Sequence, residues 1–138
     1  YIDRVETDWA FRIQLPIGTN VPFHCTASGK CFLSSLKKRE INGILSSIKL
    51  EAITEKTHVT PEGLMQELNQ IKKQGYALDR EEFMEGMIAI AVPIKDREDR
   101  FVGALAFHGP TQRISIENAV ARKEILISAS QKLREHLF

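Results

Sequence analysis

The spacing of hydrophobic and polar residues predicts both strands and helices along this chain. Residues 1–5 ("YIDRV") and 10–15 ("AFRIQL") alternate as strands do. From Ser28 onward, hydrophobic and small residues recur at helical spacing, and a second short helix is predicted from about Glu40 to Ile48. The first third of the chain is therefore expected to contain two strands followed by two helices.

The clearest helix is predicted within the segment "THVTPEGLMQELNQIKKQGYAL". Thr60 can cap its start, Pro61 suits the first helical position, and Gly75 stops it. A hydrophobic stripe at helical spacing runs between these signals. We expect this helix to pack on the sheet with that stripe.

The segment "GMIAIAVPIKDREDRFVGALAFHGP" predicts two apolar strands joined by a charged turn at residues 96–100, a hairpin buried on most of its surface. A shorter strand is predicted to end near Leu78 and Asp79, where a carboxylate could face a pocket. From Ser115, the pattern predicts one long amphipathic helix. We expect a single α+β domain over residues 1–138, with helices on an antiparallel sheet and a long C-terminal helix.

The balance of charge argues against nucleic-acid binding by this chain. Nineteen basic and eighteen acidic residues give a net charge of +1, and the one dense basic cluster is at residues 37–39. Affinity for phosphate backbones needs several cationic contacts on one face. No apolar run reaches the roughly 18 residues of a membrane span, and no signal peptide opens the chain. Neither a DNA partner nor a membrane partner is expected for these residues alone.

The histidines and cysteines lack the spacing of metal or redox motifs. Histidines stand at positions 24, 58, 108 and 136, far apart in the sequence, so no metal or other cofactor is expected. Cys25 and Cys31 are six apart, which fits neither a redox pair nor a zinc knuckle. Reduced thiols in the cytoplasm are expected. Because the chain begins in strand-like sequence without Met, we expect it to be part of a longer polypeptide.

The stretch "PFHCTASGKCFLSSL", residues 22–36, places four small residues at the start of a predicted helix. The unpaired N–H groups of a helix start can bind a carboxylate or phosphate, but small polar residues also cap any helix. A nucleotide-binding P-loop is excluded because His24 and Cys31 stand where the motif needs Gly and Ser or Thr. A thiol enzyme would need Cys25 or Cys31 beside His108 and Asp79, whereas buried, inert cysteines are far more common.

Three blocks of this sequence resemble the C-terminal effector-binding domain of IclR-type bacterial transcriptional regulators. They are "PFHCTASGKCFLS", "GYALDREEFMEGMIAIAVPI" and "VGALAFHGPTQRI", in the order and at the spacing of the family. The resemblance covers essentially all 138 residues. It implies a GAF-like domain, not an enzyme, that binds a small carboxylic or aromatic acid as its effector.

The resemblance also implies a longer regulator around this domain. A winged helix-turn-helix on the N-terminal side, which would contact DNA, and a leading strand of the sheet would lie outside this chain. The full-length protein would be a homodimer or tetramer, because such regulators read operators with paired half-sites. Two alternatives stay open: a GAF-like thiol-dependent enzyme, and a domain that only dimerises and fills its pocket with its own side chains.

The ligand pocket of the family can be carried over position by position. The residues implied are Ala10, Ile13, Val21, Ala27, Ser28, Asp79, Met87, Ala89, Ala106 and His108. Ala27 and Ser28 would give backbone donors and Asp79 the acidic group. Val at position 27 or 29 is expected to block an anion without unfolding the protein.

The last two pocket positions depart from the family pattern. Members that bind small oxo-acids tend to carry hydroxyl side chains where this chain has Ala106 and His108, so the effector cannot be named. His108 is interpreted either as a cationic partner for a carboxylate or as a surface residue at a strand end.

Overall fold

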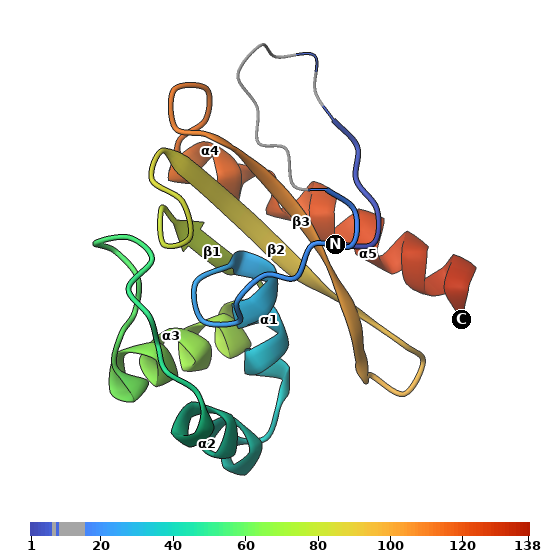
Figure 1. The fold of residues 1–138 in the computed structure, drawn as a ribbon. Helices are drawn as coiled ribbons and strands as arrows, with labels where there is room; N and C mark the ends of the chain where they lie inside the picture. The colour runs from blue at the N-terminus through green and yellow to red at the C-terminus, as the bar shows by residue number, and fades with distance from the viewer. Residues whose placement is uncertain (7, 9–15) are drawn as a thin grey trace.

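The computed structural model describes residues 1–6, 8 and 16–138. Within these residues, three strands form an antiparallel sheet in the order β1 (Ala77–Arg80), β2 (Met87–Lys95) and β3 (Phe101–Pro110). The helices α1 (Ala27–Ser35), α2 (Lys38–Ser47) and α3 (Pro61–Gln74) lie on one side of the sheet, whereas α4 (Ile116–Ala121) and α5 (Lys123–Leu137) lie on the other (Figure 1). The predicted α+β architecture is confirmed.

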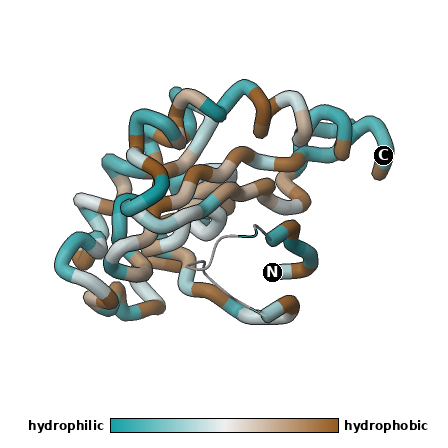
Figure 2. Tube along the Cα trace, turned by 90° about the horizontal axis from the view of Figure 1, so that it is seen from above, coloured by the Kyte–Doolittle hydropathy of each residue, from teal (hydrophilic) through white to brown (hydrophobic). Residues whose placement is uncertain are grey.

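The sheet separates two hydrophobic cores. On the first side, α1, α2 and α3 pack against the alanines of β1 and β2, among them Ala77, Ala89 and Ala91. On the second side, α4 and α5 pack against larger residues such as Ile88 and Ile90. Figure 2 shows the hydrophobic residues concentrated along the central strands and a mostly hydrophilic C-terminal end. The alternation of side chains along each strand thus supplies both cores.

The signals that predicted α3 are all used in the structure. The Thr60 side chain accepts a hydrogen bond from the Gly63 N–H at 3.1 Å, and Pro61 occupies the first helical position. Gly75 ends the helix with φ of 83°, a left-handed conformation that favours glycine. The helix predicted from Ser28 is confirmed as α1, and the helix predicted from about Glu40 to Ile48 is confirmed as α2.

The predicted hairpin is present, but its two strands differ in burial. The first six residues of β2 are buried, whereas most of β3 is half-buried because β3 lies at the edge of the described sheet. Asp96 organises the charged turn: its Oδ1 accepts from the N–H groups of Glu98 and Arg100, both at 2.9 Å. The expectation that both strands are buried on most of their surface is therefore correct for β2 only.

The prediction of a strand at residues 1–5 is wrong. Residues 1–6 form no strand; instead the Tyr1 amino group donates to the Thr19 carbonyl at 2.9 Å, and the Gly18 N–H donates to the Tyr1 carbonyl. Ile2 and Val5 are both fully exposed, so the alternation there has no buried face to support a strand. The other predicted early strand, residues 10–15, lies outside the described residues.

The single long helix predicted from Ser115 is two helices. Ser115 caps α4 as expected, accepting from the Asn118 N–H at 3.1 Å. The backbone leaves the helical conformation at Arg122, with φ of −93° and ψ of 2°, and α5 begins one residue later. The Arg122 guanidinium lies over the Phe107 ring, 5.9 Å from its centroid, so this break is tied to the sheet.

Candidate functional site

Among the described residues, nothing accepts a hydrogen bond from two backbone N–H groups at the start of α1. Thr26 caps the helix by accepting from the Gly29 N–H at 3.1 Å, while its hydroxyl donates to the Pro22 carbonyl at 2.7 Å. Within the described part of the chain, the N–H groups of Ala27 and Ser28 have no hydrogen-bond acceptor. Donors at the positive end of a helix dipole suit an anion. The assignment of these two groups as donors to a ligand stays a prediction.

Gly29 is small for a different reason from the one expected. A Cβ atom at this position would lie 2.6 Å from both the Cα and the carbonyl oxygen of Phe23. These are backbone atoms, which cannot move aside cheaply, so a valine there disrupts the packing of the helix start. The prediction that Gly29→Val leaves the protein folded is wrong, and Ala27→Val is the cleaner test of the site.

The strands bring five of the predicted site residues onto the sheet face that carries α1. In the register of the sheet, Asp79 pairs with Ala89, which pairs with His108. Ala106 lies two residues before His108 on the same face, and Met87 lies two residues before Ala89. Since neighbouring strands are about 4.8 Å apart, the backbones at Asp79 and His108 are separated by roughly 10 Å. A small ligand spans that distance.

Asp79 is a buried carboxylate with an unusual proton affinity. Its side chain is only 1% exposed, and Oδ1 accepts a hydrogen bond from the Glu82 N–H at 2.8 Å. Burial, and next the charge of Glu82, raise the pKa of Asp79 to about 6, although the Glu82 N–H and Lys30 oppose the shift. Above that pH, Asp79 is a hydrogen-bond acceptor for a donor group of a ligand.

The His108 imidazole is mostly uncharged at neutral pH. Burial lowers its pKa, because a desolvated imidazole disfavours the charged form. Its ring stacks on the Tyr1 ring, with parallel planes and centroids 5.9 Å apart. Burial, and then the charge of Asp79, raise the pKa of the Tyr1 hydroxyl. Tyr1 therefore lies close to both His108 and Asp79, and no sequence pattern indicated this.

The remaining predicted residues are only partly placed. Val21 is half-buried in the segment before α1. Ala10 and Ile13 lie outside the described residues. Two surface hollows beside α5, of about 230 Å³ and 370 Å³, contain none of the predicted site residues.

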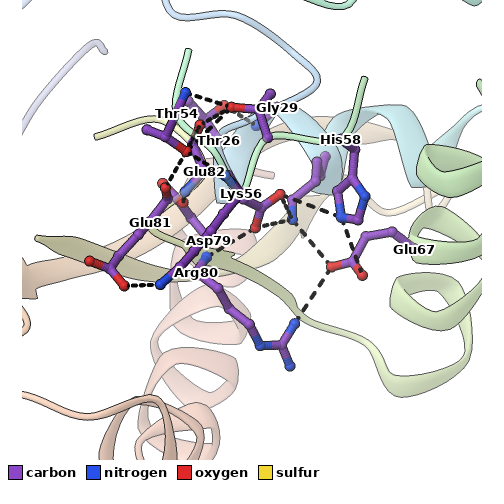
Figure 3. Close-up of polar contacts among 12 residues, drawn as sticks. Thr26, Gly29, Thr54, Lys56, His58, Glu67, Asp79, Arg80, Glu81 and Glu82 are labelled. Atoms are coloured by element: carbon purple, nitrogen blue, oxygen red, sulfur yellow. Dashed lines mark hydrogen bonds and ion pairs between the residues drawn. The ribbon is translucent and has the colours of Figure 1, made fainter. Parts of the chain in front are cut away.

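A buried network of charges lies beside Asp79, and the sequence did not predict it. The Lys30 side chain is fully buried, and its Nζ lies 2.8 Å from a carboxylate oxygen of Glu82 and 3.2 Å from Glu67. The His58 imidazole is within 4 Å of both carboxylates (Figure 3). Helical spacing was the available signal: Ala27, Lys30, Cys31 and Ser34 share the buried face of α1.

The geometry does not support a thiol nucleophile. Cys25 and Cys31 are both free and buried, and burial raises the pKa of each to about 12. A nucleophilic cysteine needs the opposite shift, because the thiolate is the reactive form. Among the described residues, no three His, Cys, Asp or Glu side chains are arranged to hold a metal ion, and no helix has the length and hydrophobicity to cross a membrane.

The fold and the placement of the sequence blocks agree with a known family. A family model described as the C-terminal domain of the bacterial transcriptional regulator IclR matches residues 1–135. The chain belongs to the family of IclR C-terminal domains. The resemblance of the three sequence blocks is thereby confirmed.

Relatives of this IclR C-terminal domain are transcriptional regulators. The probable transcriptional regulator SauR of Cupriavidus necator is 37% identical over 117 residues, which make up 85% of this chain and 46% of that protein. The chain spans about half the length of the curated relatives it matches.

Solved structures agree with the sequence relatives. IclR of Thermotoga maritima superposes with a TM-score of 0.90 at 28% identity, over 98% of this chain and 55% of that one. The inducer-binding domain of PobR from Acinetobacter, a double mutant in complex with 3-hydroxybenzoic acid, has a TM-score of 0.83 at 26% identity, over 86% of this chain and 69% of that one.

Proposed function

We propose that residues 1–138 are the effector-binding domain of a transcriptional regulator and bind a small organic acid at the start of α1. The observation that carries this proposal is the pair of unused N–H groups at Ala27 and Ser28 on the helix that packs against the face of Asp79. Asp79 is close enough to Cys25, two residues before Ala27, for its charge to raise the pKa of that thiol. This proximity supports the proposal that the donors and the carboxylate contact the same ligand.

The chemistry of the site selects an acid that also carries a hydrogen-bond donor. The carboxylate would sit against Ala27 and Ser28, where charge-assisted hydrogen bonds contribute roughly 1.5 to 3 kcal/mol. A second carboxylate would repel ionised Asp79, whereas a hydroxyl group would donate to it. The complex of the PobR domain with 3-hydroxybenzoic acid, which has one carboxyl and one hydroxyl group, supports this pattern. The apolar part of the effector would contact Met87 and Ala89.

The wider function follows from the relatives. We infer that a DNA-binding segment outside this chain completes the regulator, which would act in the cytoplasm as a homodimer or tetramer. The near-neutral charge of these residues supports a DNA contact elsewhere, since phosphate binding needs a cationic face. The raised pKa values of both thiols support a role without catalysis.

One observation favours a second candidate, a domain that only assembles. Tyr1 stacks on His108 beside Asp79, so the protein places one of its own side chains against the site. A pocket occupied in this way would need no effector. Binding measurements separate the two candidates, because only the first predicts that an acid stabilises the fold.

The test is a thermal-shift screen of small acids, from acetate to 3-hydroxybenzoate, with the matching amides as controls. A ligand at 100 times its dissociation constant adds about 2.7 kcal/mol to the stability of the folded state. Acids should raise the melting temperature and amides should not, and Ala27→Val should remove the effect. Stabilisation by amides and acids alike, or an acid that binds Ala27→Val with wild-type affinity, would place the effector elsewhere.

A further inference from the structure

A buried ion pair connects the two halves of the proposed site. Lys30 lies on α1, two residues after Ser28, and Glu82 lies three residues after Asp79 in the turn between β1 and β2. Lys30 Nζ lies 2.8 Å and 2.9 Å from the two carboxylate oxygens of Glu82, and the side chains are 0% and 4% exposed. Losing one partner would leave a buried charge uncompensated. The pair therefore fixes the turn against α1.

Hydrogen bonds of Glu82 connect the fixed turn to Asp79. Its N–H donates to Asp79 Oδ1 at 2.8 Å, and its Oε2 accepts from the Arg80 N–H at 2.9 Å. Its carbonyl accepts from the Thr57 hydroxyl at 2.7 Å. Glu82 thus holds the turn with its side chain, its N–H and its carbonyl at once.

The turn itself is strained and needs these contacts. Glu81 has φ of 59°, a left-handed conformation that is costly for residues other than glycine. The Thr54 hydroxyl donates to the Glu81 carbonyl at 2.6 Å (Figure 3). The Gly86 N–H donates to the Glu81 carboxylate at 2.9 Å. A strained turn that is fastened on both sides holds Asp79 in one orientation.

We propose that Lys30 and Glu82 are positioning residues of the effector site, which orient the Asp79 carboxylate and set its distance from the Ala27 and Ser28 N–H groups. The inference rests on the proposed function, because it assigns the pair to that same site. It explains why a lysine stands on the buried face of α1, where an apolar residue would pack at lower cost.

The charges of this pair dominate the surroundings of Asp79. Three other titratable groups lie beside it or across the sheet: the Cys25 thiol, the Tyr1 hydroxyl and the His108 imidazole. Burial raises the pKa of both the thiol and the hydroxyl and lowers that of the imidazole, so all three are uncharged at neutral pH. Burial is the largest cause of the raised pKa of Asp79, and the charges that add to it or oppose it are those of Glu82 and Lys30.

The test follows the Asp79 carboxyl by carbon NMR during a pH titration, in the wild type and in two variants. Lys30→Met removes the cation that lowers the pKa of Asp79, so its titration should move to higher pH. Glu82→Gln removes a carboxylate that raises this pKa, so the titration should move to lower pH. Opposite shifts from two members of one ion pair are expected only if both act on Asp79.

Amide hydrogen exchange supplies the second measurement. In Lys30→Met, the Glu82 N–H should exchange about tenfold faster or more relative to the slowest core amides, because its turn is no longer fastened. Two variants serve as controls. Glu67→Gln removes the charge of the other carboxylate that pairs with Lys30. Lys56→Met removes the exposed lysine that pairs with Glu81. Neither substitution removes a hydrogen bond to Asp79. Both should keep the wild-type exchange of Glu82.

Unchanged Asp79 titration and Glu82 exchange in folded Lys30→Met would overturn the proposal. Equal changes in Glu67→Gln would overturn it too, because the effect would then belong to the whole charged network. If Lys30→Met does not fold, the Asp79 titration and the exchange of the residue-82 N–H in Glu82→Gln test the proposal instead. None of them requires an effector, so a failed acid screen would count against the proposed function and not against the role of Lys30 and Glu82.

Discussion

The two faces of the sheet differ in the size of the side chains that they present. The face toward α1 carries the small residues Ala77, Ala89, Ala91, Ala104 and Ala106, together with Asp79. The face toward α5 carries the large residues Leu78, Ile88, Ile90 and Phe107. Small side chains let a helix approach the strands closely and leave its polar start near Asp79, whereas large ones fill a core. Both faces support a hydrophobic core, and the face toward α1 also carries the residues of the proposed site.

The largest expected effect is on the face toward α5. Ile90 is fully buried, so Ile90→Ala should lower the free energy of unfolding by about 2 to 5 kcal/mol. Urea unfolding measures this loss, and the affinity of the folded fraction for an acid should stay unchanged. A loss well below this range would mean that Ile90 contributes less to the core on this face than its burial predicts.

On the face toward α1, a substitution is expected to cost less stability than Ile90→Ala but to weaken acid binding more. Ala106→Leu adds volume beside the start of α1, so it should cost about 1 to 3 kcal/mol and abolish acid binding. Calorimetry gives the affinity and urea unfolding the stability. Phe107→Leu is the matched control, because its side chain points to the opposite face. If both variants lost binding equally, the division between the faces would fail.

Asp79 gives the face toward α1 a pH dependence that the other face lacks. Its pKa of about 6 in the folded protein exceeds the value of roughly 3.9 for an unfolded chain. The folded state therefore binds more protons between these values, so this contribution to stability is complete below about pH 4 and is lost as the pH rises through about 6.

Asp79→Asn tests that dependence, because the amide is uncharged at every pH. The variant should match the wild type near pH 4 and be more stable by roughly 1 to 3 kcal/mol above pH 7. Urea unfolding at several pH values measures the difference. An acid with a hydroxyl group should bind the variant more weakly. A stability difference that does not change with pH would show that Asp79 is not desolvated.

The smallest effect is expected for chemical labelling of the cysteines. Cys31 lies in the core beside α1, and Cys25 lies in the segment before α1. With pKa values raised to about 12 by burial, Cys25 and Cys31 should not react with a thiol probe at pH 7.5 while the protein is folded. Both should react at once in denaturant. Rapid labelling of either thiol in the folded protein would revive the enzyme alternative.

Local signals were enough to predict much of this fold. Thr60, Pro61 and Gly75 define α3 because each acts on its own backbone neighbours. The apolar runs of β2 and β3 likewise define the hairpin. The strand predicted at residues 1–5 failed because alternation is informative only where one face is buried, and Ile2 and Val5 are exposed. The break at Arg122 was not predicted; its side chain contacts Phe107, which is distant in sequence.

Site residues could be predicted from the sequence where their role depends on their place in a helix or strand. The unused donors at Ala27 and Ser28 follow from the helix start, and Asp79 from the end of a strand. Lys30 was missed because its partner Glu82 is 52 residues away. Tyr1 was missed because its stacking on His108 joins the first residue to β3. Such contacts depend on the complete fold.

The close approach of Gly29 to the Phe23 backbone sets a boundary for engineering new effector specificities. Residues 27, 87, 89 and 106 carry side chains that can be exchanged, so a mutant library for a biosensor belongs there. Position 29 has a backbone 2.6 Å from where any side chain would begin. A library that varies position 29 is expected to yield mainly destabilised proteins, whereas one that keeps this glycine varies the proposed site without that backbone clash.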